Sequence, residues 1–177
     1  MFVLGLADVD APTLRHDIGF LRMAVSEARS AFADGCFPTG AVLVGGNGDL
    51  ISACRNDNRH RRSFLAHPEL TLLLQHEQLL HAHPYTCSLY ASLEPCLMCL
   101  GASMMARLGR VVWAANDHWA GGSKLIQLNS SFVRSRRTEL VGPLCDEAKA
   151  ASVALLDSYF ESRDRRVLSA IKGHEHS

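Results

Sequence analysis

Two short motifs contain residue types that together can hold a metal ion and move protons. The first is His67-Pro68-Glu69, and the second is Pro95-Cys96-Leu97-Met98-Cys99, about thirty residues later. One histidine and two cysteines can bind a zinc ion and leave its fourth coordination position open. Glu69 lies two residues after His67, close enough to reach a water in that position without being a ligand. The spacing therefore predicts a zinc site beside a proton carrier.

Both motifs lie where a strand or loop is expected to enter a helix. Pro68 suits the first helical position, where its missing N–H costs nothing, so we expect a helix from Pro68 to about Leu80. A second helix is expected from Cys96 to Leu108, closed by Gly109, and residues three apart at its start share a face. The positive end of this helix favours the thiolate form of its cysteines.

Such a zinc ion lowers the pKa of its bound water to about 7, so hydroxide can attack an electrophilic carbon at neutral pH. Two other interpretations of a C-x-x-C motif exist, a redox dithiol and half of a structural zinc ribbon. The chain has no second C-x-x-C, which disfavours the ribbon. A thioredoxin-like dithiol normally follows an early strand, whereas this motif comes late, behind Glu94-Pro95.

The remaining elements predict an α/β protein. Apolar residues from Leu14 to Phe32 recur at steps of three and four, which indicates a helix with Thr13 as its N-cap and Gly35 at its end. A β-hairpin and three further strands are expected, followed by a last helix from Leu144 to about Arg166; the strands are Ala41–Val44, Leu50–Cys54, Ser88–Ser92, Val111–Ala115 and Thr138–Val141. We expect a three-layer α/β/α sandwich with a mixed five-stranded sheet, in one domain over 1–177 with its core at about 14–166.

Composition favours a small substrate. The chain has 177 residues, and its 18 basic side chains balance 18 acidic ones, so it lacks the global field of a protein that binds nucleic-acid phosphates. No basic leader or run of eighteen apolar residues is present, so we expect no signal peptide, no membrane partner and a cytoplasmic location. Four further cysteines are expected to be small buried apolar residues, namely Cys36, Cys54, Cys87 and Cys145.

The two motifs resemble the zinc-site signature of the cytidine deaminase superfamily, H-x-E followed by P-C-x-x-C. Residues Pro38–Val44 resemble the entry strand P-x-G-A-V-x-V of the branch that contains guanine deaminases, fungal-type cytosine deaminases and bacterial tRNA adenosine deaminases. Residues Leu93–Ala102 are similar to that branch's second zinc motif, and Arg107–Trp113 to the helix end and strand that follow it. The resemblance covers about Leu14 to Arg166.

The resemblance implies a zinc-dependent hydrolytic deaminase of a free nucleobase, nucleoside or related aminated heterocycle. Zinc-bound hydroxide would attack the ring carbon and release ammonia, with His67, Cys96 and Cys99 as zinc ligands. Glu69 would carry the water's proton to the ring nitrogen and the departing amine.

Further roles follow from position in the branch. Asn56 matches an asparagine that hydrogen-bonds the base, and Asp117 matches an acidic residue near the substrate. Each could instead be an ordinary turn residue. Trp119 could stack at the pocket, or belong to the core or a dimer surface.

Substrate choice stays open between a free small molecule and tRNA. Pro68 stands where the branch usually has Ala or Gly, and Arg59–Ala66 lacks the D-P-T-A-H-A-E ending of bacterial tRNA adenosine deaminases. The carboxy-terminal part, Gly142 to Arg166, is nevertheless similar to those tRNA enzymes. Arg59–Arg62 and Arg163–Arg166 could contact phosphates or be solvated.

The leading hypothesis is a free nucleobase or nucleoside, and the alternative is tRNA-specific adenosine deaminase activity, which edits adenosine to inosine. A non-catalytic zinc-stabilised partner subunit is a third hypothesis, disfavoured by the presence of Glu69. The resemblance also implies a homodimer, packed through the helix that contains Gly101–Ala106.

Overall fold

The first long helix begins earlier than the sequence predicted. The computed structural model describes residues 3–4, 9–127 and 131–162, and its helix α1 spans Ala11–Ala33. The predicted N-cap, Thr13, is wrong. The Asp10 carboxylate is the cap, because it accepts hydrogen bonds from the Thr13 N–H at 3.0 Å and the Thr13 hydroxyl at 2.8 Å. The helix ends at Ala33, and Gly35, which was predicted to end it, follows the C-cap Asp34 with φ +72°, a value that glycine adopts without strain.

The five predicted strands are confirmed and form one mixed sheet. Strand β2 (Gly40–Val44) pairs antiparallel with β3 (Leu50–Arg55) on one side and with β4 (Ser88–Leu93) on the other. Strands β5 (Arg110–Ala115) and β6 (Glu139–Val141) continue the sheet in parallel. A two-residue strand, β1 (Val3–Leu4), adds a sixth member parallel to β6, which gives the order β1-β6-β5-β4-β2-β3. Two residues are too few to give a periodic signal in the sequence.

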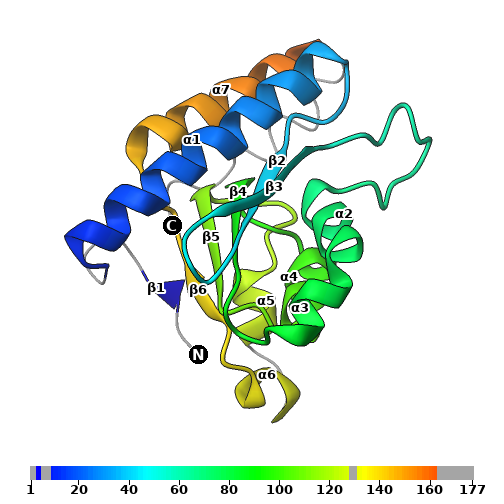
Figure 1. The fold of residues 1–177 in the computed structure, drawn as a ribbon. Helices are drawn as coiled ribbons and strands as arrows, with labels where there is room; N and C mark the ends of the chain where they lie inside the picture. The colour runs from blue at the N-terminus through cyan, green and yellow to red at the C-terminus, as the bar shows by residue number, and fades with distance from the viewer. Residues whose placement is uncertain (1–2, 5–8, 128–130, 163–177) are drawn as a thin grey trace.

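Alternating side chains place two large clusters of buried residues on opposite faces of the sheet, and a third, smaller cluster lies where the ends of β4 and β5 meet the last helix. On β2, Ala41 and Leu43 join one cluster of buried side chains, whereas Val42 and Val44 join the other. Helices α1 and α7 (Asp146–Glu161) cover the second cluster, and the first lies under α2 (Pro68–Gln75) and α4 (Leu97–Met105) (Figure 1). The predicted three-layer sandwich is therefore confirmed.

Helix boundaries differ from the predicted ones at three places. The helix expected from Pro68 to Leu80 divides at His76 into α2 and α3 (Glu77–Ala82), because His76 leaves helical geometry at φ −115° and ψ 20°. Helix α4 ends at Met105, before the predicted Leu108, since Arg107 adopts a left-handed φ of +57°. Helix α7 begins at Asp146, two residues after the predicted Leu144, and ends at Glu161 with Ser162 as its C-cap; residues 163–166 of the predicted span lie outside the described residues.

Two five-residue helices were not predicted, α5 (Ser123–Gln127) and α6 (Ser131–Ser135). One turn of helix carries too little periodicity to be recognised in a sequence.

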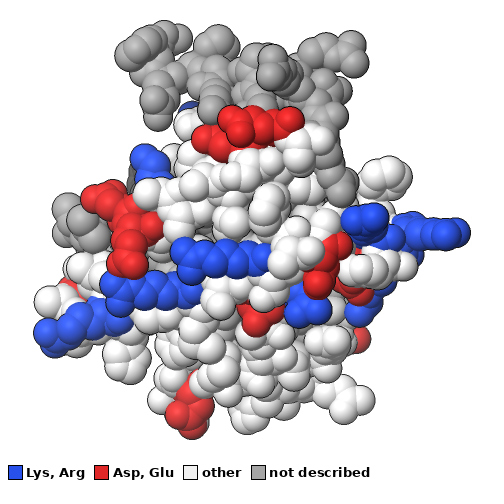
Figure 2. All heavy atoms as spheres, turned by 90° about the horizontal axis from the view of Figure 1, so that it is seen from above, with Lys and Arg blue, Asp and Glu red and all other residues white. Residues whose placement is uncertain are grey.

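Charged side chains of both signs are interspersed on the face seen from above Figure 1. Figure 2 shows Lys and Arg next to Asp and Glu across this face, without one large field of a single sign. Within the part of the chain that the structure describes, no helix is long and apolar enough to cross a membrane.

Candidate functional site

Four chain segments meet at one edge of the sheet because of the strand directions. Strands β4 and β5 are parallel, so both end at this edge, and β2 begins there because it runs antiparallel to β4. The Gly40 N–H donates to Ser92 Oγ at 3.1 Å, which joins the start of β2 to the end of β4. The Asn56 N–H, just after β3, donates to the Thr39 carbonyl at 2.9 Å. Ligands of open α/β sheets commonly bind outside such strand ends.

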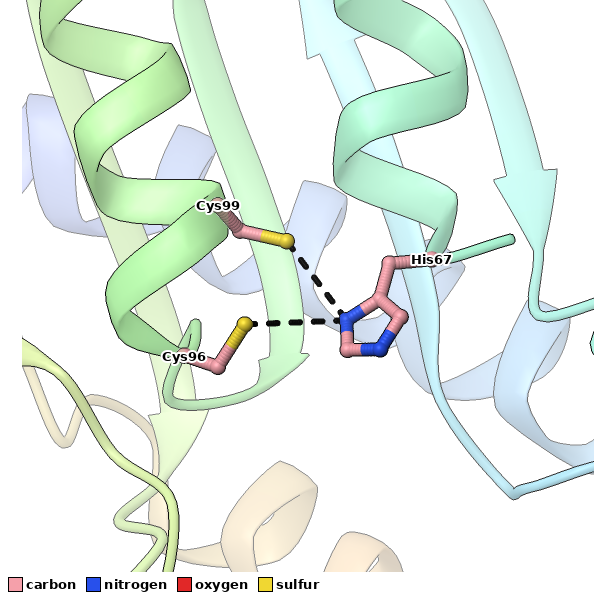
Figure 3. A group of neighbouring side chains, drawn as sticks. All are labelled: His67, Cys96 and Cys99. Atoms are coloured by element: carbon pink, nitrogen blue, oxygen red, sulfur yellow. Dashed lines mark hydrogen bonds between the residues drawn. The ribbon is translucent and has the colours of Figure 1, made fainter. Parts of the chain in front are cut away.

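The structure brings the three predicted zinc ligands together at this edge (Figure 3). His67 is the N-cap of α2, Cys96 is the N-cap of α4, and Cys99 lies in the first turn of α4. The sulfurs of Cys96 and Cys99 lie 3.7 and 3.5 Å from His67 Nδ1, and all three ligand atoms are within 4.8 Å of one another. Zinc–sulfur and zinc–nitrogen bonds at a tetrahedral angle place the two donor atoms about 3.6 Å apart. The three side chains therefore fit a zinc ion.

The electrostatics of the two thiols also suit a cation. The neighbouring thiol of Cys99 and the His67 imidazole lower the pKa of Cys96 to about 4, whereas the Cys96 sulfur and burial raise the pKa of Cys99. A bound zinc ion would favour the thiolate form of both sulfurs. Neither His67 nor Cys96 uses its side chain to cap its own helix, so both remain directed to the shared centre.

Glu69 lies beside this trio and is only 5% exposed. Its Oε2 is 3.6 Å from Cys99 Sγ. Burial removes water from the carboxyl group and raises the pKa of Glu69 to about 6. A carboxyl group with a pKa near neutrality can both accept and return a proton, which is the behaviour of a general acid–base group.

A cavity of about 260 Å³ lies over the trio, and its walls include His67, Glu69 and Cys96. Pockets for drug-sized ligands usually measure about 300–1,000 Å³, so this volume suits a single heterocycle. Asn56 lines the cavity and is 3% exposed. Its Oδ1 accepts the Asn58 N–H at 3.0 Å and its Nδ2 donates to Thr39 Oγ1 at 3.4 Å, so the amide is held firmly in the wall.

Asp117 lines the same cavity and also forms a turn. Its Oδ1 accepts the backbone N–H groups of Trp119 and Ala120, both at 2.9 Å. Both interpretations of Asp117 that the sequence left open are compatible with this position. Trp119 and Phe64 also line the cavity, and their exposed fractions are 67% and 94%. Phe64 was not among the predicted site residues, because a lone aromatic residue in a polar loop gives no signal of its place.

Glu94 is a second residue of the cavity wall that was not among the predicted site residues. It lines the cavity and is 8% exposed, and its carboxylate accepts the Asp117 N–H at 3.2 Å and the Ser123 N–H at 3.0 Å. It thereby ties the loop after β5 to the segment that carries Cys96. Its position directly before Pro95 in the zinc motif could have indicated that Glu94 lies at the site.

Known proteins match this chain across the site. The family model described as the cytidine and deoxycytidylate deaminase zinc-binding region matches residues 14–115. The chain belongs to this family.

Among curated deaminases, a tRNA-specific adenosine deaminase from Aquifex aeolicus is 35% identical over 104 residues, which covers 58% of this chain and 68% of that protein. A cytosine deaminase from Candida albicans is 26% identical over 106 residues, 60% of this chain and 71% of that protein. A longer relative, a tRNA(Ile)-lysidine synthase from Deinococcus deserti, is 34% identical over 151 residues; these are 82% of this chain but only 27% of that protein. A solved structure from a study of A-to-I editing by tRNA:A34 deaminases is 29% identical in sequence and superposes with a TM-score of 0.63. The match covers 78% of this chain and 99% of the chain in that structure.

Proposed function

We propose that this deaminase replaces the exocyclic amine of a free nucleobase, nucleoside or related heterocycle with an oxo group. The observation that carries the proposal is the small cavity whose wall holds His67, Cys96 and the buried Glu69. Its volume suits one ring system, and the balanced charge of the chain gives no general attraction for a polyanion.

The chain's residues would divide the reaction between them. His67, Cys96 and Cys99 hold the zinc ion, which when bound supplies the Lewis acidity that activates water. The Glu69 carboxylate accepts a proton from the attacking water and passes it to the ring nitrogen. The water oxygen would become bonded to the ring carbon as a hydroxyl group. Glu69 would then carry the proton of that hydroxyl group to the exocyclic amine, the bond between the ring carbon and the amine nitrogen would break, and the products would be ammonia and an oxo group on the ring.

The cavity wall would orient the ring. Asn56 supplies an amide, which can donate and accept hydrogen bonds at the edge of a heterocycle. Asp117 keeps Oδ2 available for an amine or ring N–H, because its two turn hydrogen bonds use Oδ1. These contacts act on the ring itself and apply equally to a free base and to a base within a nucleic acid.

A second candidate function is adenosine deamination in tRNA. Two exposed aromatic side chains of the cavity wall, Phe64 and Trp119, favour it, because aromatic faces stack unpaired bases that flank a flipped-out nucleotide. The similarity to the Aquifex aeolicus enzyme supports the same substrate.

Ammonia release by the zinc-loaded protein tests both candidates. The panel contains guanine, cytosine, adenine, their nucleosides and bulk tRNA, each at low and high salt. Turnover of a free base or nucleoside that is insensitive to salt supports the first candidate. Turnover of tRNA alone, falling steeply with salt, supports the second, because phosphate contacts release counterions. No turnover across the panel would contradict deamination of these bases and nucleosides and of tRNA, and would leave a related aminated heterocycle as the substrate or a non-catalytic zinc subunit.

The ligand assignment has a separate test. We expect His67→Ala to lose its zinc and part of its stability together, since two thiolates alone bind zinc poorly. Metal analysis and thermal unfolding measure both effects. An unchanged zinc content at this site would contradict the assignment of His67.

We also propose that the chain forms a homodimer through α4. Met105 is 66% exposed on this helix, and α4 contributes Ala102 and Met105 to a groove of mixed polarity that it shares with α2 and α3. Sedimentation velocity gives the mass in solution, and a monomer at micromolar concentration would contradict this proposal.

A further inference from the structure

A second group of metal-ligating side chains lies outside the zinc trio. Cys36 was predicted to be a small buried apolar residue, and it is buried, but its sulfur faces the imidazole of His60 at 3.7 Å. Asp57 Oδ1 lies 2.8 Å from the same imidazole nitrogen, Nδ1. The three ligand atoms are all within 4.8 Å of one another. Cys36 follows α1, whereas Asp57 and His60 belong to the long loop from β3 to α2 (Figure 1).

The geometry of this group resembles that of the zinc trio in one distance and in its arrangement around one imidazole nitrogen. In both, one Nδ1 nitrogen faces two partners, and the sulfur–nitrogen distance of 3.7 Å between Cys36 and His60 equals that between Cys96 and His67. A ring nitrogen carries at most one hydrogen, so it can donate to only one of its two partners. An ion bound between the three atoms satisfies all of them. The nitrogen–oxygen distance must then widen by about half an ångström, which a surface-loop carboxylate permits.

Charge and access also fit a divalent ion. A thiolate from Cys36 and the Asp57 carboxylate supply two negative charges, which balance the charge of Zn²⁺. The Arg61 Nε–H donates to the other carboxylate oxygen, Oδ2, at 2.9 Å, which fixes Asp57 with Oδ1 toward His60. Outer hydrogen bonds of this kind commonly orient metal ligands. The side chains of His60 and Asp57 are 57% and 35% exposed, so an ion can enter from solvent although Cys36 is buried.

We propose that Cys36, Asp57 and His60 form a second zinc site, with its fourth position open to water. The site joins the end of α1 to the loop that runs from Asn56 to His67. This loop supplies Asn56 and Phe64 to the cavity wall, so the second ion would fix that wall in place. It complements one direct tie between the same segments, from the Phe37 N–H to Asn58 Oδ1 at 3.3 Å.

Zinc stoichiometry tests this proposal on the full chain. The purified protein is saturated with zinc, exchanged into buffer with micromolar free zinc, and analysed for metal per chain. We expect two equivalents in the wild type and one in His60→Ala and in Cys36→Ser. Two control variants, Cys54→Ser and His83→Ala, remove the same residue types elsewhere and are expected to retain two.

Cobalt substitution gives an independent readout. Cys36→Ser removes one of the three thiolates that would bind metal. The thiolate-to-cobalt charge-transfer absorbance should therefore fall by about one third. His60→Ala alters an exposed side chain, so it decides the question even if Cys36→Ser fails to fold. A single zinc equivalent in the wild type, or two in His60→Ala, would overturn the second site. Unchanged cobalt absorbance in folded Cys36→Ser would overturn it as well.

Discussion

Replacement of Glu69 by glutamine tests the proton carrier most directly. Glutamine keeps the size of this buried side chain but cannot accept a proton. A positioned general acid–base group contributes about 10²–10⁴-fold to rate. We therefore expect kcat of Glu69→Gln to fall by that factor, which equals about 3–5.5 kcal/mol of transition-state stabilisation. Zinc content should stay unchanged, because Glu69 is not part of the ligand trio.

Neighbouring carboxylates should not replace Glu69, which is why we expect the full loss. Both oxygens of Glu94 already accept backbone N–H groups, from Asp117 and Ser123. Asp117 uses Oδ1 to close its own turn. Neither carboxylate can move to the position of Glu69 without breaking these hydrogen bonds.

The assay is ammonia release on the best substrate of the panel, with metal analysis and circular dichroism on the same samples. Asp117→Asn is the matched control, since it makes the same acid-to-amide change on the same cavity wall. We expect it to raise KM more than it lowers kcat. Activity of Glu69→Gln within tenfold of the wild type, with zinc bound, would refute the proposed proton transfer.

Three further predictions concern stability and the cavity wall. Arg110→Met leaves the fully buried Asp17 without its bidentate partner. The free energy of unfolding should fall by about 3–5 kcal/mol, which lowers Tm by roughly 6 to 20 °C. The control Glu139→Gln, at the exposed end of the same network, should change Tm little. Burial and the bond to Asp17 raise the pKa of Tyr90, so its contribution to stability is complete below pH 10 and is lost as the pH rises further. Urea unfolding from pH 8 to 11 should show a smaller alkaline decline in Tyr90→Phe. Gly122→Ala places a methyl group 2.7 Å from backbone atoms of α4, so it should cost about 1–3 kcal/mol and raise KM, as measured by unfolding and kinetics.

Local spacing explains why the zinc trio could be predicted from the sequence. Cys96 and Cys99 are fixed relative to each other by one helical turn, and Glu69 is fixed relative to His67 by two residues. Each half of the site is therefore a property of a short segment. The continuous apolar run Ala41–Val44 likewise predicted a strand, because both faces of β2 are buried.

Features that depend on distant contacts could not be predicted in the same way. Asp57 and His60 belong to a charged loop that the sequence also allowed to be simply solvated, and only the fold brings them to Cys36, more than twenty residues earlier. The sequence around Glu94 does not indicate that its carboxylate accepts hydrogen bonds from the loop after β5. The break of the predicted helix at His76 has no proline or glycine to announce it.

At this edge of the sheet, the residues of the proposed chemistry lie on helices, whereas the residues that could select the substrate lie on loops. The zinc trio and Glu69 lie at the starts of α2 and α4, which pack on the sheet and cannot move independently of its core. Phe64 and Trp119 lie on two loops and are largely exposed, so they can change without disturbing that core. Relatives of this family act on molecules as different as cytosine and tRNA, which this arrangement permits. Exchanging the loop residues should therefore alter KM among substrates, whereas the deamination chemistry should depend on the helix starts.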